Sequence, residues 1–234
     1  MSLISSRDRV FILTGAGVSA ESGIPTFRDA GGLWRNYRIE EVASPEAWRR
    51  DPWLVWEFYS MRRRIAASAK PNPAHFAIAT FEQQIKERLF LCTQNVDNLH
   101  EQAGSASVVH MHGELFKSRC DSCGRPPFAD QNTYEAAADV PRCRCGGQIR
   151  PHICWFGEMP FELDRIYDAL EKCTLFIAVG TSGVVEPAAS FVAHVRRQAR
   201  TVYVSPEEPA NASLFTECHF GKAGELLPRL FKLE

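Results

Sequence analysis

Five short runs of apolar and β-branched residues recur along the chain, each followed closely by residues that favour turns. They cover residues 9–14, 89–93, 108–111, 175–179 and 201–205. Because these runs lack the polar–apolar alternation of a half-exposed strand, they predict strands that are buried on both faces. Such strands are typical of parallel sheets with helices on both sides.

Helix-length segments separate several of these strands, at residues 73–88, 161–172 and 186–198. The alternation predicts an α/β fold with a doubly wound, Rossmann-like parallel sheet. Two stretches interrupt it: residues 45–69, rich in Trp, Arg and Ala with helical spacing, and residues 117–151, which hold a cysteine cluster. We therefore expect a sheet domain of residues 1–35, 76–116 and 154–234, with a smaller helical and metal-binding module of residues 36–75 and 117–153.

Composition and charge narrow the class of protein. With 234 residues, 45% of them hydrophobic, the chain is globular and long enough to bury a sizeable core. Its 27 basic and 28 acidic residues nearly cancel, which argues against nucleic-acid and membrane-surface binding. No apolar run approaches the roughly 20 residues of a membrane helix, and the first residues lack a signal peptide's apolar core. We expect a cytoplasmic monomer with no nucleic-acid or membrane partner.

Four of the eight cysteines cluster in the second interrupting stretch: Cys120, Cys123, Cys143 and Cys145. A C-x-x-C pair followed by a second pair has nearly the spacing of a four-thiolate zinc site. The second pair is C-x-C, one residue shorter than usual, and unmetallated cysteines are the alternative. Four thiolates leave no open coordination position, so the predicted zinc, one per chain, is structural.

The first predicted strand runs into a G-x-G-x-x-A sequence that begins at Gly15. In this pattern a tight turn brings backbone N–H groups to a pyrophosphate at a helix N-terminus. A glycine turn without any ligand is the alternative. The segment after it reads as a loop rather than a second strand ending in an acidic residue, so an ordinary hydride-transfer dehydrogenase is disfavoured.

Polar side chains follow the next two predicted strands. Asn95 and Asp97 come after the second strand, and His112 comes after the third. Doubly wound sheets bind ligands at this edge, so these side chains are candidates for binding or proton transfer. The alternatives are a helix cap for the Asn-x-Asp turn and a hydrogen-bonded structural role for the histidine.

Six segments occur in one order: GAGVSAESGIPTFRD at 15–29, TQNVDNLH at 93–100, HG at 112–113, the paired cysteines, RPHICWFGE at 150–158 and GTS at 180–182. In this order they resemble the sirtuins, a family of NAD-dependent protein lysine deacylases. The resemblance covers about residues 9–228, and the short chain is similar to the bacterial members. It implies use of NAD to remove acyl groups from lysine side chains of other proteins, with release of nicotinamide, O-acyl-ADP-ribose and free lysine.

The resemblance also implies roles for individual residues. The positions matched to NAD binding are Gly15, Ala16, Gly17, Ser19, Phe27, Arg28, Gln94, Asn95, Asp97, Gly180, Thr181, Ser182, Ser205 and Ala223. Ser205 departs from the family, which usually has Asn there. His112 matches the general base, and the four paired cysteines match the zinc ligands.

Two further groups match substrate-binding positions. The strand that pairs with the substrate backbone is matched by Trp155, Phe156, Gly157 and Glu158. Ala43, Tyr59 and Arg62 match the pattern of members that prefer malonyl, succinyl or glutaryl lysine. On a helix, Tyr59 and Arg62 project from one face. We interpret the neighbouring Arg63 and Arg64 as solvated.

Three other functions stay open at this point. Mono-ADP-ribosyl transfer would use the same cofactor on a protein nucleophile, but the set of Asn95, Asp97 and His112 favours deacylation. A non-catalytic NAD or ADP-ribose sensor would not need His112. A zinc-module nucleic-acid binder is disfavoured by the near-neutral charge.

Overall fold

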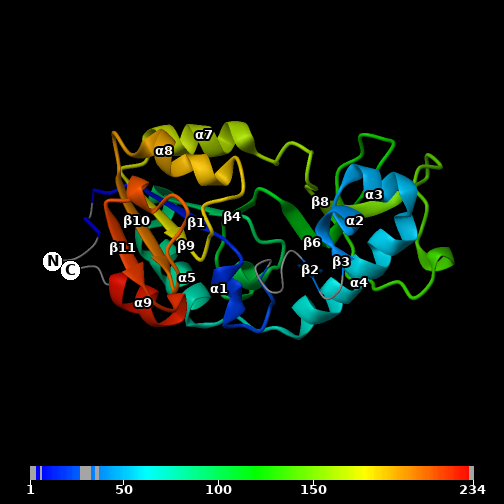
Figure 1. The fold of residues 1–234 in the computed structure, drawn as a ribbon, viewed down its shortest axis with the longest axis horizontal. Helices are drawn as coiled ribbons and strands as arrows, with labels where there is room; N and C mark the ends of the chain where they lie inside the picture. The colour runs from blue at the N-terminus through cyan, green and yellow to red at the C-terminus, as the bar shows by residue number, and fades with distance from the viewer. Residues whose placement is uncertain (1–3, 6, 27–32, 35–36, 232–234) are drawn as a thin grey trace.

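A six-stranded parallel sheet forms the larger part of the molecule (Figure 1). The computed structural model describes residues 4–5, 7–26, 33–34 and 37–231. The strands of this sheet are β1 (Val10–Thr14), β4 (Leu89–Thr93), β5 (Val108–His110), β9 (Leu175–Val179), β10 (Arg200–Ser205) and β11 (Glu217–Phe220). All five predicted runs are therefore strands, and β11 is an additional one at the sheet edge.

The strand order, β11-β10-β9-β1-β4-β5, places β1 at the point where the winding of the chain reverses. The next strands, β4 and β5, continue on one side of β1, and β9, β10 and β11 continue on the other. In doubly wound sheets ligands bind at the carboxyl ends of the strands beside this reversal. Gly15, Gln94 and Gly180, which directly follow β1, β4 and β9, lie at that edge.

Helices cover both faces of the sheet (Figure 1). One core holds Val10 and Ile12 together with side chains of α5 (Pro73–Ile85) and α9 (Ala223–Leu230). The other core holds Phe11 and Leu13 with side chains of α7 (Leu163–Lys172) and α8 (Phe191–Val195). Successive residues of β1 thus enter opposite cores, which explains why the strand is apolar throughout. Helix α8 is shorter than the predicted 186–198.

The smaller part of the molecule contains helices and an antiparallel sheet at the opposite end from the two termini (Figure 1). Its helices are α2 (Ile39–Val42), α3 (Pro45–Arg50) and α4 (Pro52–Ser68), and its strands are β6 (Gly113–Cys120), β7 (Phe128–Ala129) and β8 (Ile149–Ile153). Side chains of Ser44 and Asp51 accept backbone N–H bonds at the starts of α3 and α4. Trp56 and Tyr59 of α4 pack with Leu115 and other sheet residues in a separate core.

The other described elements are short. β2 (Leu33–Trp34) pairs antiparallel with β3 (Tyr37–Arg38), while α1 (Gly17–Ala20) and α6 (Leu99–Gln102) follow β1 and β4. The 3₁₀ helices are η1 (Lys86–Arg88), η2 (Ala137–Asp139), η3 (Ala188–Ser190) and η4 (Ala212–Leu214). None of the described helices has the length and apolar character needed to cross a membrane.

The interpretation of Arg63 as a solvated residue is wrong, because its side chain is buried, with 1% exposure. Its guanidinium group forms an ion pair with Asp130 at 3.1 Å and donates to the carbonyl of Leu115 and the hydroxyl of Ser118. Burial alone would raise the pKa of Asp130, but Ser118 and Arg63 outweigh it and lower the pKa. The pair fastens α4 to the small sheet. Arg64 is exposed, as expected, and pairs with Glu135.

Candidate functional site

The turn between β1 and α1 fits closely against the loop that follows β9. Gly17 donates its N–H to the carbonyl of Gly180 at 2.8 Å. A Cβ at Gly15 would lie 2.8 Å from the Gly180 oxygen, and one at Gly17 would lie 2.7 Å from the Gly180 Cα. Both glycines are therefore required for this approach, whatever else the turn binds.

Three of the predicted site residues are joined by their side chains at the switch-point edge. The amide of Asn95 donates to the Gly15 carbonyl and to the Ser19 hydroxyl, both at 3.1 Å. Ser19 in turn donates to the Asp97 carboxylate at 3.1 Å. Asp97 also accepts the backbone N–H of Leu99, but the N-cap of α6 is Asn98, whose side chain makes no capping bond. Burial raises the pKa of Asp97, although these donors oppose the shift.

Other NAD candidates that the structure describes follow the carboxyl ends of strands in the same sheet. Gln94 donates its side-chain amide to the Thr181 hydroxyl at 3.0 Å, which links the loops after β4 and β9. Gly180 donates its N–H to the carbonyl of Val204, next to Ser205, and both Ser205 at the end of β10 and Ala223 at the start of α9 are buried. Phe27 and Arg28 lie outside the described residues, while Ala16 precedes α1 and Ser182 accepts a backbone bond from Ala210.

His112 is held between the two parts of the molecule. It lies between β5 and β6, and its carbonyl accepts the N–H of Cys154. Its ring Nδ1 lies 3.2 Å from the carbonyl of Gln94, so Nδ1–H donates and Nε2 carries the lone pair. Burial lowers the pKa of His112, with the bond to Gln94 in partial opposition. The imidazole is thus neutral at physiological pH, as a general base must be.

The predicted substrate-side residues also come together. Phe156 donates its N–H to the carbonyl of Ala43 at 3.1 Å, and the indole of Trp155 donates to the Tyr59 hydroxyl at 3.1 Å. The expectation of a strand at 155–158 is wrong in this structure, because β8 ends at Ile153 and residues 156–157 form a turn. The Glu158 carboxylate closes that turn by accepting the Trp155 N–H at 2.8 Å.

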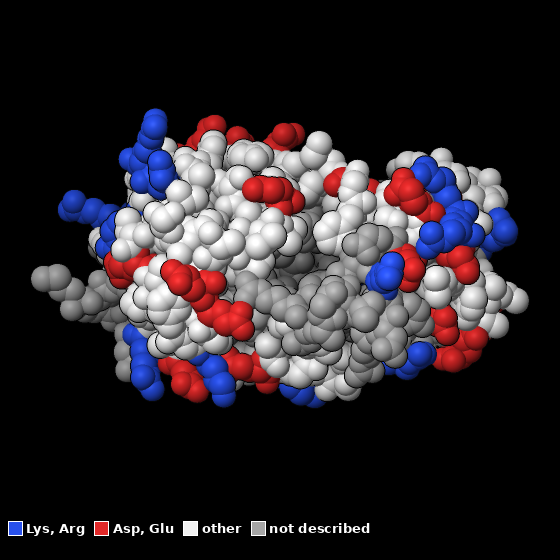
Figure 2. Space-filling model, in the orientation of Figure 1, with Lys and Arg blue, Asp and Glu red and all other residues white. Residues whose placement is uncertain are grey.

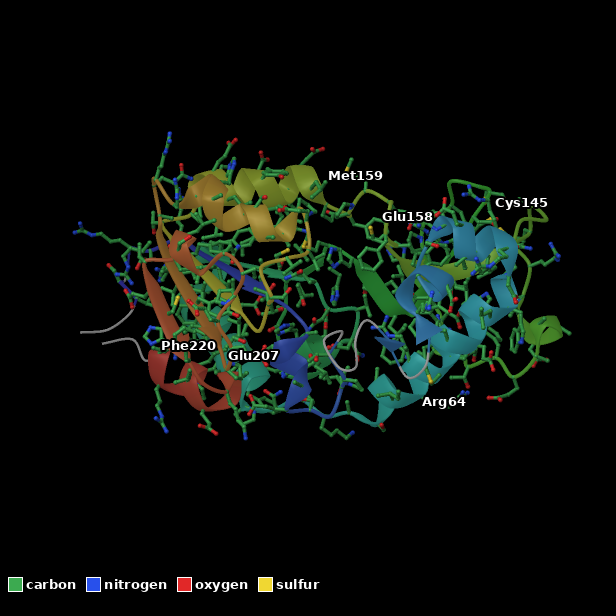
Figure 3. All side chains as sticks on the ribbon, viewed as in Figure 1. Arg64, Cys145, Glu158, Met159, Glu207 and Phe220 are labelled. Atoms are coloured by element: carbon green, nitrogen blue, oxygen red, sulfur yellow. The ribbon has the colours of Figure 1, made fainter. Side chains whose placement is uncertain are left out.

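The Glu158 carboxylate also contacts two arginine side chains. Arg150 donates to both carboxylate oxygens of Glu158, at 2.7 and 2.9 Å, and Arg119 approaches at 3.4 Å. These contacts outweigh burial and lower the pKa of Glu158. Phe156 and Met159 on either side of Gly157–Glu158 are exposed large apolar residues. Met159 and Glu158 lie beside the space between the two parts of the molecule (Figure 3).

Arg62 packs against two aromatic rings of its own helix. Its guanidinium lies over the rings of Phe58 and Tyr59, at 5.6 to 5.7 Å from their centroids. Burial lowers the pKa of Arg62, and the charges of Tyr59 and Asp97 oppose that shift. Figure 2 shows a hollow where the larger and smaller parts meet.

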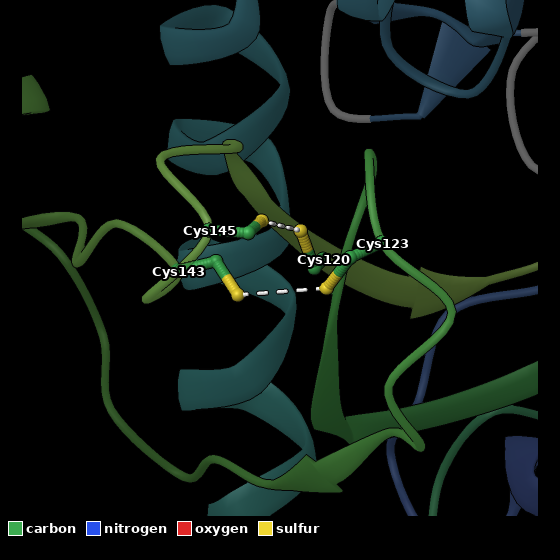
Figure 4. Close-up of side chains that lie close together, drawn as sticks. All are labelled: Cys120, Cys123, Cys143 and Cys145. Atoms are coloured by element: carbon green, nitrogen blue, oxygen red, sulfur yellow. Dashed lines mark hydrogen bonds between the residues drawn. The ribbon is translucent and has the colours of Figure 1, made fainter.

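The cysteine cluster forms a compact four-thiol site (Figure 4). The Sγ atoms of Cys120, Cys123, Cys143 and Cys145 all lie within 4.8 Å of one another. Tetrahedral zinc with Zn–S bonds of about 2.3 Å would separate its sulfurs by roughly 3.8 Å, so the thiols fit the ion. A Cβ at Gly147 would lie 2.9 Å from the Cys120 Sγ, so the short C-x-C turn needs glycine beside it. The cluster is consistent with a structural zinc.

Metal analysis of the purified protein is expected to give about one zinc per chain, because all four thiolates converge. Chelation should unfold the small module first, since structural zinc contributes directly to folding. Limited proteolysis near residues 121–148 would report that loss. A zinc content far below one, with a module that resists protease without metal, would contradict the assignment.

Sequence reasoning missed two buried histidines behind the NAD candidates. His100 lies 3.0 Å from the Thr14 hydroxyl, and His75 lies 3.5 Å from the Ser19 hydroxyl. Their rings are 4.9 Å apart. Burial lowers the pKa of His75 to about 4. For His75 the sequence held one signal, the three-residue spacing of a capping box. Asn72 and His75 form such a box at the start of α5, in which each side chain accepts a bond from the backbone of the other end of the box.

Comparison with known proteins agrees with this geometry. A family model described as "Sir2 family" matches residues 15–187. A Vibrio cholerae NAD-dependent protein deacylase is 49% identical over 94% of this chain and 91% of its own length, and Leishmania major SIR2rp3, also described as an NAD-dependent protein deacylase, is 50% identical over 94% and 92%. A solved Sir2 homologue in complex with NAD is 42% identical and superimposes with a TM-score of 0.88, covering 97% of this chain and 89% of that one.

Proposed function

The chain belongs to the Sir2 family and is an NAD-dependent protein deacylase, and from that premise we propose that it removes succinyl and malonyl groups in preference to acetyl groups. The substrates are acylated lysine side chains of other proteins. The observation that carries the preference is the partly buried Arg62, whose guanidinium lies 5.6 Å from the centroid of the Tyr59 ring.

The chemistry of the acyl group explains why this arrangement matters. A succinyl group ends in a carboxylate, which would be costly to bury unpaired. Arg62 offers a planar fork for two parallel hydrogen bonds to it, and the Tyr59 hydroxyl, which accepts from Trp155, retains its own proton to donate. An acetyl group carries no charge, so it binds without hydrogen bonds to the Arg62 guanidinium.

The residues at the switch-point edge fit NAD. The glycine turn, the amides of Gln94 and Asn95 and the buried Asp97 offer donors and acceptors to its ribose, phosphate and carboxamide groups. When bound, NAD would supply an electrophilic ribose carbon, with nicotinamide as its leaving group, for reaction with the acyl oxygen. Asp97 orients the carboxamide side, and partly buried Ile24 contributes apolar surface that limits the access of water.

His112 moves the proton in this reaction. The Nδ1–H bond to Gln94 fixes the ring and directs the unprotonated Nε2 away from the loop. The neutral imidazole would accept at Nε2 the proton of a ribose hydroxyl of bound NAD and so activate that hydroxyl toward the acyl carbon. The proposed path needs no further nucleophile from the protein.

Mass spectrometry of an acyl-lysine peptide panel, with and without NAD, tests the proposal. We expect NAD-dependent loss of succinyl and malonyl groups with a higher kcat/KM than loss of acetyl, together with nicotinamide and O-acyl-ADP-ribose. An acetyl peptide that outperforms the succinyl peptide of the same sequence would refute the preference. ADP-ribose attached to the peptide, without deacylation, would instead favour the transferase alternative.

A further inference from the structure

His110 is the last residue of β5, two residues before the proposed base, and is not needed for the proton transfer itself. Its Nδ1 lies 3.0 Å from the backbone carbonyl of Asn95, and its Nε2 lies 2.7 Å from the carboxylate of Glu101. A carbonyl and an ionised carboxylate are both acceptors only, so both ring nitrogens must carry a proton. His110 is therefore an imidazolium, the positively charged form of the side chain.

His112, two residues later, has the opposite character. Its Nδ1 donates to the carbonyl of Gln94, the residue directly before Asn95. Two histidines of one chain segment thus hold two consecutive carbonyls of the loop after β4. His110 is charged and hydrogen-bonded at both ring nitrogens. His112 is neutral, and its Nε2 can accept a proton.

The loop between these bonds carries the proposed NAD-side amides. The Asn95 side chain reaches Gly15 and Ser19, and Asp97 accepts from Ser19. If the bond between His110 and the Asn95 carbonyl were lost, the loop would keep two bonds on this side, from His112 to the Gln94 carbonyl and from the Leu115 N–H to the Val96 carbonyl, and the Asn95 carbonyl between them would lose its donor. A small displacement would then move both the amide of Asn95 and the acceptor that orients the base.

We propose that His110 is a positioning residue: as an imidazolium anchored by Glu101, it fixes the loop of residues 94–97 and, through that loop, the orientation of His112. The inference rests on the proposed roles of Asn95, Asp97 and His112. It assigns a function to the His110–Glu101 pair that the reaction itself does not require.

The charges around His110 favour its protonated form. Burial alone would lower the pKa of His110, but Glu101 on α6, the Asn95 carbonyl and Glu114 on β6 outweigh burial and raise it. Asp97 in the loop before α6 also interacts with His110, whereas His100 on α6 is itself kept neutral because its pKa is lowered.

A polar cavity of about 750 Å³ also borders His110. Beyond Glu114, its lining includes Arg119 of β6, Glu162 before α7 and Arg165 of α7. The His110 side chain is nevertheless only 6% exposed, while that of Glu101 is 40% exposed. The imidazolium therefore borders the cavity with little exposed surface, while its carboxylate partner is partly exposed.

The sign of the pH effect follows from the direction of this shift. A histidine whose pKa is raised in the folded state stabilises its environment at low pH and loses that contribution as pH rises through the raised pKa. Deprotonated His110 would present a lone pair to either the Asn95 carbonyl or the Glu101 carboxylate. Activity should therefore fall on the alkaline side because of His110 and on the acid side because His112 becomes protonated.

Three variants separate this role from a merely structural one. His110→Asn places its amide where Nδ1 stands, so it keeps a donor for the Asn95 carbonyl without any titration. Glu101→Gln lets a neutral His110 donate through Nδ1 and accept the glutamine amide at Nε2. His110→Phe removes both bonds. His194→Asn, an exposed histidine on α8 outside the site, is the matched control.

The readout is kcat/KM for NAD across pH, measured with an acetyl-lysine peptide so that it does not depend on the proposed preference for acidic acyl groups. We expect His110→Phe to lower kcat/KM at least about tenfold at neutral pH, since a hydrogen bond of this class is worth about that factor. His110→Asn and Glu101→Gln should stay within about threefold and lose the alkaline fall that wild type and His194→Asn show.

The outcomes are distinct. If His110→Phe does not fold, as judged by circular dichroism, the two polar variants still decide, because the inference requires their alkaline limb to disappear. An unchanged alkaline limb in both polar variants overturns the inference. The proposed acyl preference fails independently, through the wild-type comparison of succinyl with acetyl peptides.

Discussion

Replacing His112 with alanine is expected to lower the rate of deacylation by about 10² to 10⁴, the usual loss on removing a general base. The neutral imidazole is held by Gln94 on one nitrogen and offers the other to the substrate. Its pKa is lowered by burial, so the base stays unprotonated at pH values where an ordinary imidazole is already half charged. His110, two residues away, cannot replace it, because both of its ring nitrogens are engaged.

The measurement is steady-state deacylation of an acyl-lysine peptide, beside calorimetric titration with NAD. Binding of NAD should be largely retained in His112→Ala, since the base acts after the cofactor has bound. His194→Ala, which removes an exposed histidine of α8, controls for loss of an imidazole as such. Turnover of His112→Ala within a few-fold of wild type would exclude His112 as the base.

The sheet of the larger domain was predictable because its interior strands carry their signal locally. The run at Leu175–Val179 is buried at every position, so apolar character alone identifies it. The edge strand Glu217–Phe220 escaped prediction because only one of its sides is paired and its residues are exposed or half-buried. The local pattern of apolar residues cannot predict such a strand, because the strand forms by pairing with β10.

The small module shows why some side chains resist prediction. In α4, Arg63 lies seven positions after Trp56 and three after Ser60, on the face that enters the core. That spacing was a usable signal against solvation. The partner that permits burial, Asp130, lies 67 positions further along the chain, and no local pattern connects the two.

The candidate site was predictable as a set of positions but not as a set of contacts. The resemblance matched Gln94, Thr181 and Asn95 to NAD binding, while the bonds from Gln94 to Thr181 and from Asn95 to Gly15 join loops far apart in sequence. The individual binding roles stay predictions, as do the module boundaries, the monomeric state and the cytoplasmic location. Size-exclusion chromatography with light scattering would test the monomer.

Replacing Arg62 with methionine is expected to lower kcat/KM for a succinyl-lysine peptide by about 10- to 150-fold and to change deacetylation little. Hydrogen bonds to charged groups contribute about 1.5 to 3 kcal/mol, which corresponds to that range. Methionine keeps an apolar stem for packing against Phe58 and Tyr59 but removes the fork. The loss should appear mainly in KM, because the distal carboxylate is held alike in the ground and transition states.

Arg64→Met supplies the matched control, since Arg64 lies on the same helix but is exposed and paired with Glu135. It should leave both activities within about twofold, because exposed ion pairs contribute little. The decisive quantity is the ratio of desuccinylation to deacetylation in wild type, Arg62→Met and Arg64→Met. Equal losses of both activities in Arg62→Met would mean that Arg62 supports the packing of α4 around Phe58 and Tyr59 rather than recognising the acyl group. Only recognition depends on the charge that a succinyl group carries and an acetyl group lacks.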